Sequence, residues 1–223
     1  MKKEYGSRNN KLTELVMIID RSGSMSGMEE STIEGYNKLL KEQKAIEGEV
    51  LVSTVLFDHE VEVLHDRLPI RKVNYLTHRD YQTRGCTALL DAVGGAIHHI
   101  ARLHKHTNPK YRPGRTLFVI ITDGMENASR RYTYPQVKQL IDKEKEKYDW
   151  EFLFLGANID AARDAGRMGI DAYHAVDYHS DARGTQLNYE VLSRAVGSVR
   201  MSRAPLSKGW KKDIDADYKR RNK

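Results

Sequence analysis

The feature that most constrains the fold of this chain is an uninterrupted apolar run that ends at a carboxylate. The run covers residues 15–19, which read Leu-Val-Met-Ile-Ile, and Asp20 follows it directly. An unbroken apolar run of this length is typical of a strand that is buried on both faces, as strands of a parallel sheet are. The run therefore predicts a buried strand of a parallel sheet.

Polar side chains gather at the point where this strand ends. Asp20, Ser22 and Ser24 alternate along the chain, and Gly23 permits a tight turn between the two serines. Oxygen-bearing side chains of this kind suit a hard divalent cation. Open α/β sheets also bind their ligands at the carboxyl ends of their strands. The stretch therefore predicts a cation site at this edge of the sheet.

Three short motifs resemble the signatures of von Willebrand factor A (vWA) domains, which carry a metal-ion-dependent adhesion site. Residues 20–24 match the pattern Asp-x-Ser-x-Ser, residues 85–87 match Gly-x-Thr, and residues 122–124 match Thr-Asp-Gly. The motifs occur in the order that the family shows, and apolar runs precede the first and the third. The resemblance covers roughly residues 12 to 200, and it identifies the chain as similar to the intracellular type of vWA domain.

The resemblance implies a ligand set and a function. The implied metal is Mg²⁺ or Mn²⁺, with the hydroxyls of Ser22, Ser24 and Thr87 as direct ligands. Asp20 and Asp123 are implied to act directly or through water. An Asp or Glu side chain of a protein partner would then complete the coordination of the metal, so the resemblance implies a protein-binding adaptor module.

The rest of the chain alternates between strand and helix patterns, which predicts a doubly wound α/β domain with a Rossmann-like, mostly parallel six-stranded sheet and helices on both faces. The short spacer between residues 50–57 and the more polar strand that begins at residue 61 predicts a hairpin, and hence one antiparallel edge strand. The other predicted strands lie at residues 116–122, 151–156 and 172–176, and the predicted helices lie at about 26–46, 88–103, 133–148, 158–169 and 185–199.

The net charge of +6 is concentrated at the two ends of the chain. Residues 203–223 hold eight basic and three acidic side chains, and residues 1–11 hold four basic and one acidic. We therefore expect three parts: an N-terminal basic extension (1–11), a vWA-like domain (12–202) and a flexible basic C-terminal tail (203–223).

An alternative function starts from this tail. Trp210 and Tyr218 are interleaved with lysines and arginines, a pattern that allows base stacking together with phosphate contacts. In this alternative the chain is a nucleic-acid-associated protein that binds through residues 203–223. Truncation at Ser202 separates the two functions, because only the nucleic-acid function depends on the tail.

The composition also bears on the compartment. No apolar run approaches the roughly 20 residues that a membrane helix needs, and no apolar signal-peptide segment follows the basic start. The single cysteine allows no disulfide within the chain. We therefore expect a cytoplasmic protein that has no membrane partner.

We expect no enzymatic activity in the chain itself. Some magnesium-dependent phosphatases resemble this sequence in placing Asp-x-Asp after a buried strand, where the second aspartate serves as acid or base. The corresponding residue is Ser22, which cannot act as an acid or base near neutral pH. A metal-dependent phosphohydrolase is the third alternative, and it requires phosphoester turnover that Asp20→Asn abolishes.

Other side chains near these motifs receive structural interpretations. We expect Cys86 to be a small packed residue. His98 and His99 face different sides of a helix, so they do not form the i, i+4 pair of a zinc site. Gly94 and Gly95 indicate close packing of that helix on the sheet.

Two polar residues directly follow the third motif. Glu126 and Asn127 lie beside the predicted metal site. They either influence the choice of partner or have a plain role in a turn, and the sequence leaves both interpretations open.

Overall fold

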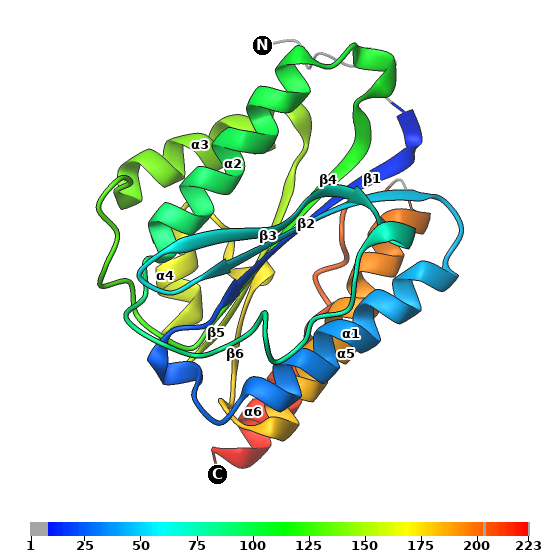
Figure 1. Ribbon diagram of the computed structural model, residues 1–223. Coiled ribbons are helices and arrows are strands. Elements are labelled where there is room, and N and C mark those ends of the chain that lie inside the picture. Colours follow the sequence, from blue (N-terminus) through cyan, green and yellow to red (C-terminus); the bar gives the residue numbers. More distant parts are fainter. Residues whose placement is uncertain (1–8, 203, 223) are drawn as a thin grey trace.

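The computed structural model describes residues 9–202 and 204–222, and it shows a six-stranded sheet between two layers of helices (Figure 1). The strand order is β3-β2-β1-β4-β5-β6, with β3 antiparallel to β2 and every other neighbouring pair parallel. The predicted fold class is therefore confirmed, including the antiparallel edge strand. The strands are β1 (Asn9–Asp20), β2 (Glu49–Phe57), β3 (Val61–Pro69), β4 (Pro113–Thr122), β5 (Glu151–Ala157) and β6 (Ala175–Tyr178).

The helices cover both faces of this sheet. Figure 1 shows α2 (Leu89–His106), α3 (Tyr134–Tyr148) and α4 (Ala161–Arg167) on one face. The other face carries α1 (Glu29–Ala45), α5 (Ala182–Met201) and α6 (Lys212–Arg221). Among the described residues, no helix combines the length with the apolar character that a membrane span requires.

The apolar run of β1 feeds two separate cores because successive side chains of a strand point to opposite faces. Val16 and Ile18 belong to the cluster beneath α2, α3 and α4. Leu15, Met17 and Ile19 belong to the cluster beneath α1, α5 and α6. All five side chains are buried. The run is therefore continuous because a helix layer covers each face of the strand.

The parallel register sets the position of the site. Ile19 of β1 lies opposite Leu56 of β2 on one side and opposite Ile121 of β4 on the other. The carboxyl ends of β1 and β4 therefore lie next to each other. The first and third motifs begin at these two strand ends, so the fold brings together residues that are about a hundred positions apart.

The C-terminal segment differs from the flexible tail that its charge suggests. Residues 204–222 pack against the domain, with Leu206 and Ile214 buried in the core beneath α5. The indole N–H of Trp210 donates to the main-chain oxygen of Tyr173 at 2.9 Å. The physical reason is an apolar stripe at four-residue spacing (206, 210 and 214), which the many basic residues around it conceal.

The N-terminal segment is part of the sheet from Asn9 onward. β1 begins at Asn9, inside the segment that we expected to be an N-terminal extension. The remainder of that extension, residues 1–8, lies outside the described residues, as do residues 203 and 223.

The glycine pair in α2 does not pack on the sheet as expected. A Cβ atom at Gly94 would lie 2.5 Å from the ring of Tyr132. This glycine therefore lets Tyr132, in the loop that follows the third motif, pack closely against α2. A Cβ atom at Gly95 would have nothing within 4 Å. The close approach therefore joins α2 to a loop, and it involves one glycine of the pair.

Candidate metal centre

The three motifs meet at the carboxyl edge of the sheet. The first motif follows β1, the second lies directly before α2, and the third follows β4. The amide of Gly23 in the first motif donates to the main-chain oxygen of Gly85 in the second at 3.1 Å. The amide of Asn127, just after the third motif, donates to the main-chain oxygen of Thr87 at 3.1 Å. Main-chain hydrogen bonds thus connect the three loops to one another.

Three hydroxyl groups converge above Gly124. A Cβ atom at this glycine would lie 2.9 Å from Thr87 Oγ1, 3.1 Å from Ser24 Oγ and 3.8 Å from Ser22 Oγ. The hydroxyls of Ser22 and Ser24 are themselves 3.1 Å apart. The three hydroxyls that the motifs predict therefore surround one small space, and the absence of a side chain at Gly124 keeps that space open.

The two carboxylates of the predicted set lie beside these hydroxyls and accept hydrogen bonds from neutral donors. Asp20 is fully buried and accepts from the Thr122 hydroxyl at 2.6 Å and from the amide of Ser22 at 2.7 Å. Asp123 accepts from the hydroxyl of Ser24 at 2.5 Å and from that of Ser180 at 3.1 Å. Among the described residues, no lysine, arginine or histidine pairs with either carboxylate.

The electrostatic consequence is a raised pKa for both carboxylates in the metal-free protein. Burial raises the pKa of Asp20 to about 6, although hydrogen bonds from Thr122 and Ser22 oppose the shift, and the charge of Asp123 adds to it. Burial also raises the pKa of Asp123. A divalent cation would supply the missing positive charge, and oxygen atoms from hydroxyl and carboxylate groups are ligands that Mg²⁺ and Mn²⁺ accept. The residues present therefore fit such an ion.

Several residues that hold this arrangement were not identified as site residues in the sequence. The Tyr81 hydroxyl donates to the main-chain oxygen of Asp20 at 2.5 Å, and Ser180 donates to Asp123 from the loop between β6 and α5. No motif marks either residue, because each contact joins segments that are far apart along the chain.

The structure favours the turn role for Glu126 and Asn127. Asn127 Oδ1 accepts from the amide of Thr87 at 2.9 Å, and Glu126 accepts from the amide of Leu90, in the first turn of α2, at 2.9 Å. Both side chains thus hold the second motif and the start of α2. Met125, which precedes them, is 63% exposed.

The expectation for Cys86 is wrong. Its side chain is exposed rather than packed. The residue lies between Gly85 and Thr87 in the second motif, and its exposure means that it contributes no core packing.

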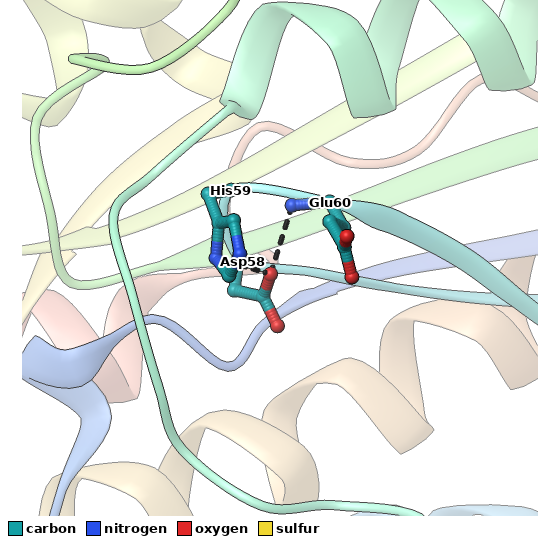
Figure 2. A group of neighbouring side chains, drawn as sticks. All are labelled: Asp58, His59 and Glu60. Atoms are coloured by element: carbon teal, nitrogen blue, oxygen red, sulfur yellow. Dashed lines mark hydrogen bonds and ion pairs between the residues drawn. The ribbon is translucent and has the colours of Figure 1, made fainter.

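A second group of candidate ligands lies at the turn between β2 and β3. Asp58, His59 and Glu60 place one potential ligand atom each within 4.8 Å of one another (Figure 2). The carboxylate of Asp58, however, already accepts from the Nε atoms of both Arg21 and Arg84, each at 2.9 Å. Two guanidinium groups at one carboxylate oxygen oppose the approach of a cation. This group is better described as the centre of an ion-pair network.

The histidines near the end of α2 are also engaged in pairs. Nε2 of His99 lies 2.9 Å from Asp66 Oδ1, and Nε2 of His104 lies 3.0 Å from Glu14 Oε2. Nδ1 of His98 lies 3.4 Å from the hydroxyl of Tyr132. The three histidines therefore contact three different partners, and they do not converge on one point.

Neither a protein-family model nor a curated protein matches the sequence. Solved structures do match the fold. The structure is similar to the vWF domain of the type V pili tip protein Mfa5 from Porphyromonas gingivalis, with a TM-score of 0.57, 12% identity, and 87% of this chain and 98% of that chain covered.

Two further solved structures are similar at the same level. The von Willebrand factor type A structure from Catenulispora acidiphila gives a TM-score of 0.54 at 13% identity, covering 86% of this chain and 43% of that chain. The manganese-loaded TRAP protein from Plasmodium vivax gives 0.53 at 15% identity, covering 80% and 72%. This chain thus spans less than half of the Catenulispora chain and most of the other two. At these identities the likeness concerns the fold, and this chain has the fold of von Willebrand factor A domains.

Proposed function

We propose that the chain is a protein-binding adaptor module that depends on a divalent metal ion. In this proposal Mg²⁺ or Mn²⁺ binds among Asp20, Ser22, Ser24, Thr87 and Asp123, and an Asp or Glu side chain of a partner protein binds to the metal. The observation that carries the proposal is the pair of buried carboxylates that have neutral hydrogen-bond donors and face three converging hydroxyls.

Each residue of the site has a distinct part in the proposal. The hydroxyls of Ser22, Ser24 and Thr87 offer neutral oxygen ligands, so they add no negative charge to the site. Asp20 and Asp123 supply the charge, and Gly124 leaves the space open. A bound divalent ion whose ligands are mostly neutral keeps a strong affinity for a further anionic oxygen. The chain's own residues thus hold the ion and leave its last position to the partner.

The comparisons support the metal, at the level of the fold. One of the similar structures is described as manganese-loaded. The P. gingivalis structure is a domain of a pili tip protein. We nevertheless infer a cytoplasmic location for this chain from its single cysteine and its composition.

The proposal assigns no catalysis to the chain. Ser22 occupies the position at which Asp-x-Asp phosphatases carry their acid or base, and its hydroxyl lies 3.1 Å from that of Ser24. A serine hydroxyl cannot take over that acid or base role near neutral pH. We therefore infer binding rather than phosphoester hydrolysis.

The packing of the C-terminal segment engages several side chains on which the nucleic-acid alternative depends. Trp210 is bound to the domain through Tyr173, and the ring of Tyr218 lies 4.8 Å from that of His179. Arg221 pairs with Asp181 and Asp217. Trp210, Tyr218 and Arg221 are thus engaged with the protein, and we favour a protein partner.

The test is a calorimetric titration of metal-free protein with MnCl₂ and with MgCl₂. We expect one ion per chain, and we expect Ser22→Ala/Ser24→Ala to abolish the binding. Ser26→Ala is the matched control, because this exposed serine lies in the same loop and its replacement should leave binding unchanged. Metal binding of wild-type strength by Ser22→Ala/Ser24→Ala would overturn the proposal.

The partner is tested separately with an array of peptides that each contain one central Asp or Glu. We expect the chain to be retained in MnCl₂, released by EDTA, and not retained when the central residue is Asn or Gln. Retention that ignores EDTA would show that binding does not pass through the metal.

A further inference from the structure

Asp58 lies at the end of β2, and both of its carboxylate oxygens are occupied. The side chain is fully buried. Its Oδ2 atom accepts from Nε of Arg21 and from Nε of Arg84, each at 2.9 Å. Its Oδ1 atom accepts from the amide of Glu60 at 2.8 Å and lies 3.0 Å from Nδ1 of His59 (Figure 2). One carboxylate thus connects two guanidinium groups to a main-chain turn.

The two guanidinium groups belong to the two loops that carry the candidate hydroxyl ligands. Arg21 lies between Asp20 and Ser22 in the first motif, and Arg84 lies three residues before Thr87. The amide of Arg84 donates to the main-chain oxygen of Arg21 at 2.9 Å, so the two loops also contact each other directly. Asp58 therefore sits where both ligand loops can be held from one point.

Main-chain contacts fix the same three segments together. The main-chain oxygen of Asp58 accepts from the amide of Ala88, next to the candidate ligand Thr87, at 2.7 Å. Gly85 has a φ of +66°, and a Cβ atom there would lie 2.2 Å from Nδ1 of His59. The second ligand loop thus fits closely over the turn that Asp58 begins, and it depends on a glycine in the left-handed region.

The negative charge of Asp58 also balances the positive charges of Arg21 and Arg84. Arg21 is 5% exposed, and its other contact is an ion pair with the half-exposed Glu62. Removing the charge of Asp58 would leave Arg21 with Glu62 and Arg84 with Glu60, and both of these carboxylates lie at the surface. Two cations that have lost their shared buried counter-charge would then lie next to the place where the metal is proposed to bind.

We infer that Asp58 is a positioning residue for the proposed metal centre, which holds the loops of Ser22 and Thr87 in register through Arg21 and Arg84. The inference rests on the proposed function, because it concerns the same site. Asp58 is not one of the proposed ligands, and its side chain contacts the two arginines and its own turn. It acts through the two arginines, as residues outside a coordination sphere act through the ligands that they orient.

The experiment compares manganese titrations of wild type, Asp58→Asn and Glu60→Gln by calorimetry. Glu60→Gln is the matched control, because Glu60 lies in the same turn and its carboxylate pairs with Arg84 at the surface, at 3.2 Å. We expect Asp58→Asn to lower the manganese affinity about tenfold or more, and Glu60→Gln to lower it by less than half of one decade. Wild-type affinity in a folded Asp58→Asn variant would overturn the inference.

A second measurement separates positioning from a general loss of stability. Hydrogen exchange in EDTA reports on the amides of Gly23 and Arg84, which are bonded between the two ligand loops, and on the amide of Ile170, which donates to the main-chain oxygen of Ala165 outside the site. We expect Asp58→Asn to speed exchange at Gly23 and Arg84 and to leave Ile170 unchanged. Equal acceleration at all three amides would show that the role is only structural.

Two further outcomes are informative. If Asp58→Asn does not fold, Arg84→Ala replaces it, because Arg84 is half-exposed and its removal leaves Asp58 paired with Arg21. We expect Arg84→Ala to lower the manganese affinity more than Glu60→Gln does, and equal affinities would overturn the inference. If wild type binds no manganese, the proposed function fails, whereas wild-type binding with no effect of either variant contradicts the positioning role alone.

Discussion

Two buried carboxylates on β1 have opposite surroundings. Glu14 and Asp20 are both fully buried, and they lie six residues apart on one strand. Nε of Arg67 lies 3.0 Å from each oxygen of Glu14, and Nε2 of His104 lies 3.0 Å from one of them. Asp20 has neutral donors, namely Thr122 and the amide of Ser22.

This difference indicates what each end of the sheet does. At the amino end of β1 the fold provides the cations that a buried carboxylate needs, so the charges are matched within the protein. At the carboxyl end the fold provides hydroxyls around an open space, and the charge of Asp20 is left for a cation from outside. Asp58, which lies beside the site with two arginines, belongs with Glu14.

The largest expected effect separates the two carboxylates of β1 directly. Glu14→Gln leaves the partly buried guanidinium of Arg67 without its counter-charge, so we expect it to lower the free energy of unfolding by about 3 kcal/mol. Asp20→Asn removes a buried charge that has no cationic partner, so in EDTA we expect no loss of stability or a gain. Urea unfolding followed by circular dichroism measures both, and a larger loss for Asp20→Asn than for Glu14→Gln would contradict the comparison.

The next effect concerns the space that distinguishes the carboxyl end. Gly124→Ala places a methyl group 2.9 Å from Thr87 Oγ1 and 3.1 Å from Ser24 Oγ while it leaves every candidate ligand in place. We expect it to weaken manganese binding by about 1–3 kcal/mol, the usual cost of an inserted methyl group. Calorimetry measures the change.

The control for this variant is another glycine with room for a side chain. Gly95→Ala adds a methyl group to α2 where nothing lies within 4 Å. We expect it to raise the free energy of unfolding by about 0.5–1 kcal/mol, because alanine favours a helix, and to leave manganese binding unchanged. Metal binding of wild-type strength in Gly124→Ala would show that the ion lies outside the space above Gly124.

The pH dependence of stability tests whether Asp58, like Glu14, is a buried carboxylate whose charge is matched by cations of the protein. Burial alone would raise the pKa of Asp58, but hydrogen bonds from Arg84 and the amide of Glu60, together with the charge of Arg21, lower it below its ordinary value of 3.8. Because the folded pKa is depressed, the stabilisation is present above the ordinary pKa and is lost as the pH falls through the folded value.

We therefore expect metal-free wild type to lose stability below about pH 4, and Asp58→Asn to show a smaller loss over the same range. Urea unfolding in EDTA between pH 6 and pH 2.5 provides the measurement. If the free energy of unfolding fell equally with pH in the two proteins, the charge of Asp58 would not be stabilised by the two arginines.

The smallest expected effect concerns Asp123, which depends on the loop between β6 and α5. Ser180 in that loop donates to Asp123, and Arg221 of α6 pairs with the neighbouring Asp181. We expect Arg221→Ala to weaken manganese binding less than Gly124→Ala does. Arg194→Ala is the control, because it breaks a pair with Asp213 near the start of α6 and should leave metal binding unchanged. Wild-type manganese affinity in Arg221→Ala would exclude a role of the pair between Arg221 and Asp181 in the site.

The fold and the candidate ligands could be predicted because they depend on local patterns. The apolar run that ends at Asp20 marks a strand and its carboxyl end, and short motifs mark Thr87 and Asp123. The contacts that support the site could not be predicted in this way. Ser180 and Asp58 are ordinary residues in their own segments, and their roles arise when the fold brings distant segments together.

The C-terminal segment illustrates a different limit. Its basic residues suggest a flexible tail, while the apolar positions 206, 210 and 214 form a stripe that packs on the domain. Acidic residues of the segment, such as Asp217, pair with arginines, so the net charge of the segment misrepresents its surface. A count of charges treats the segment as if it were isolated from the domain. Whether the segment packs on the domain depends on its tertiary contacts.

The most direct test of the central claim is a crystal of the protein soaked in MnCl₂ and measured at the manganese absorption edge. The anomalous difference map locates the ion without reference to any assumed ligand. We expect one peak per chain among the hydroxyls of Ser22, Ser24 and Thr87, beside Asp20 and Asp123. A peak at Asp58, His59 and Glu60 with none above Gly124 would contradict the account, because the ion would then lie where the protein already supplies its own cations.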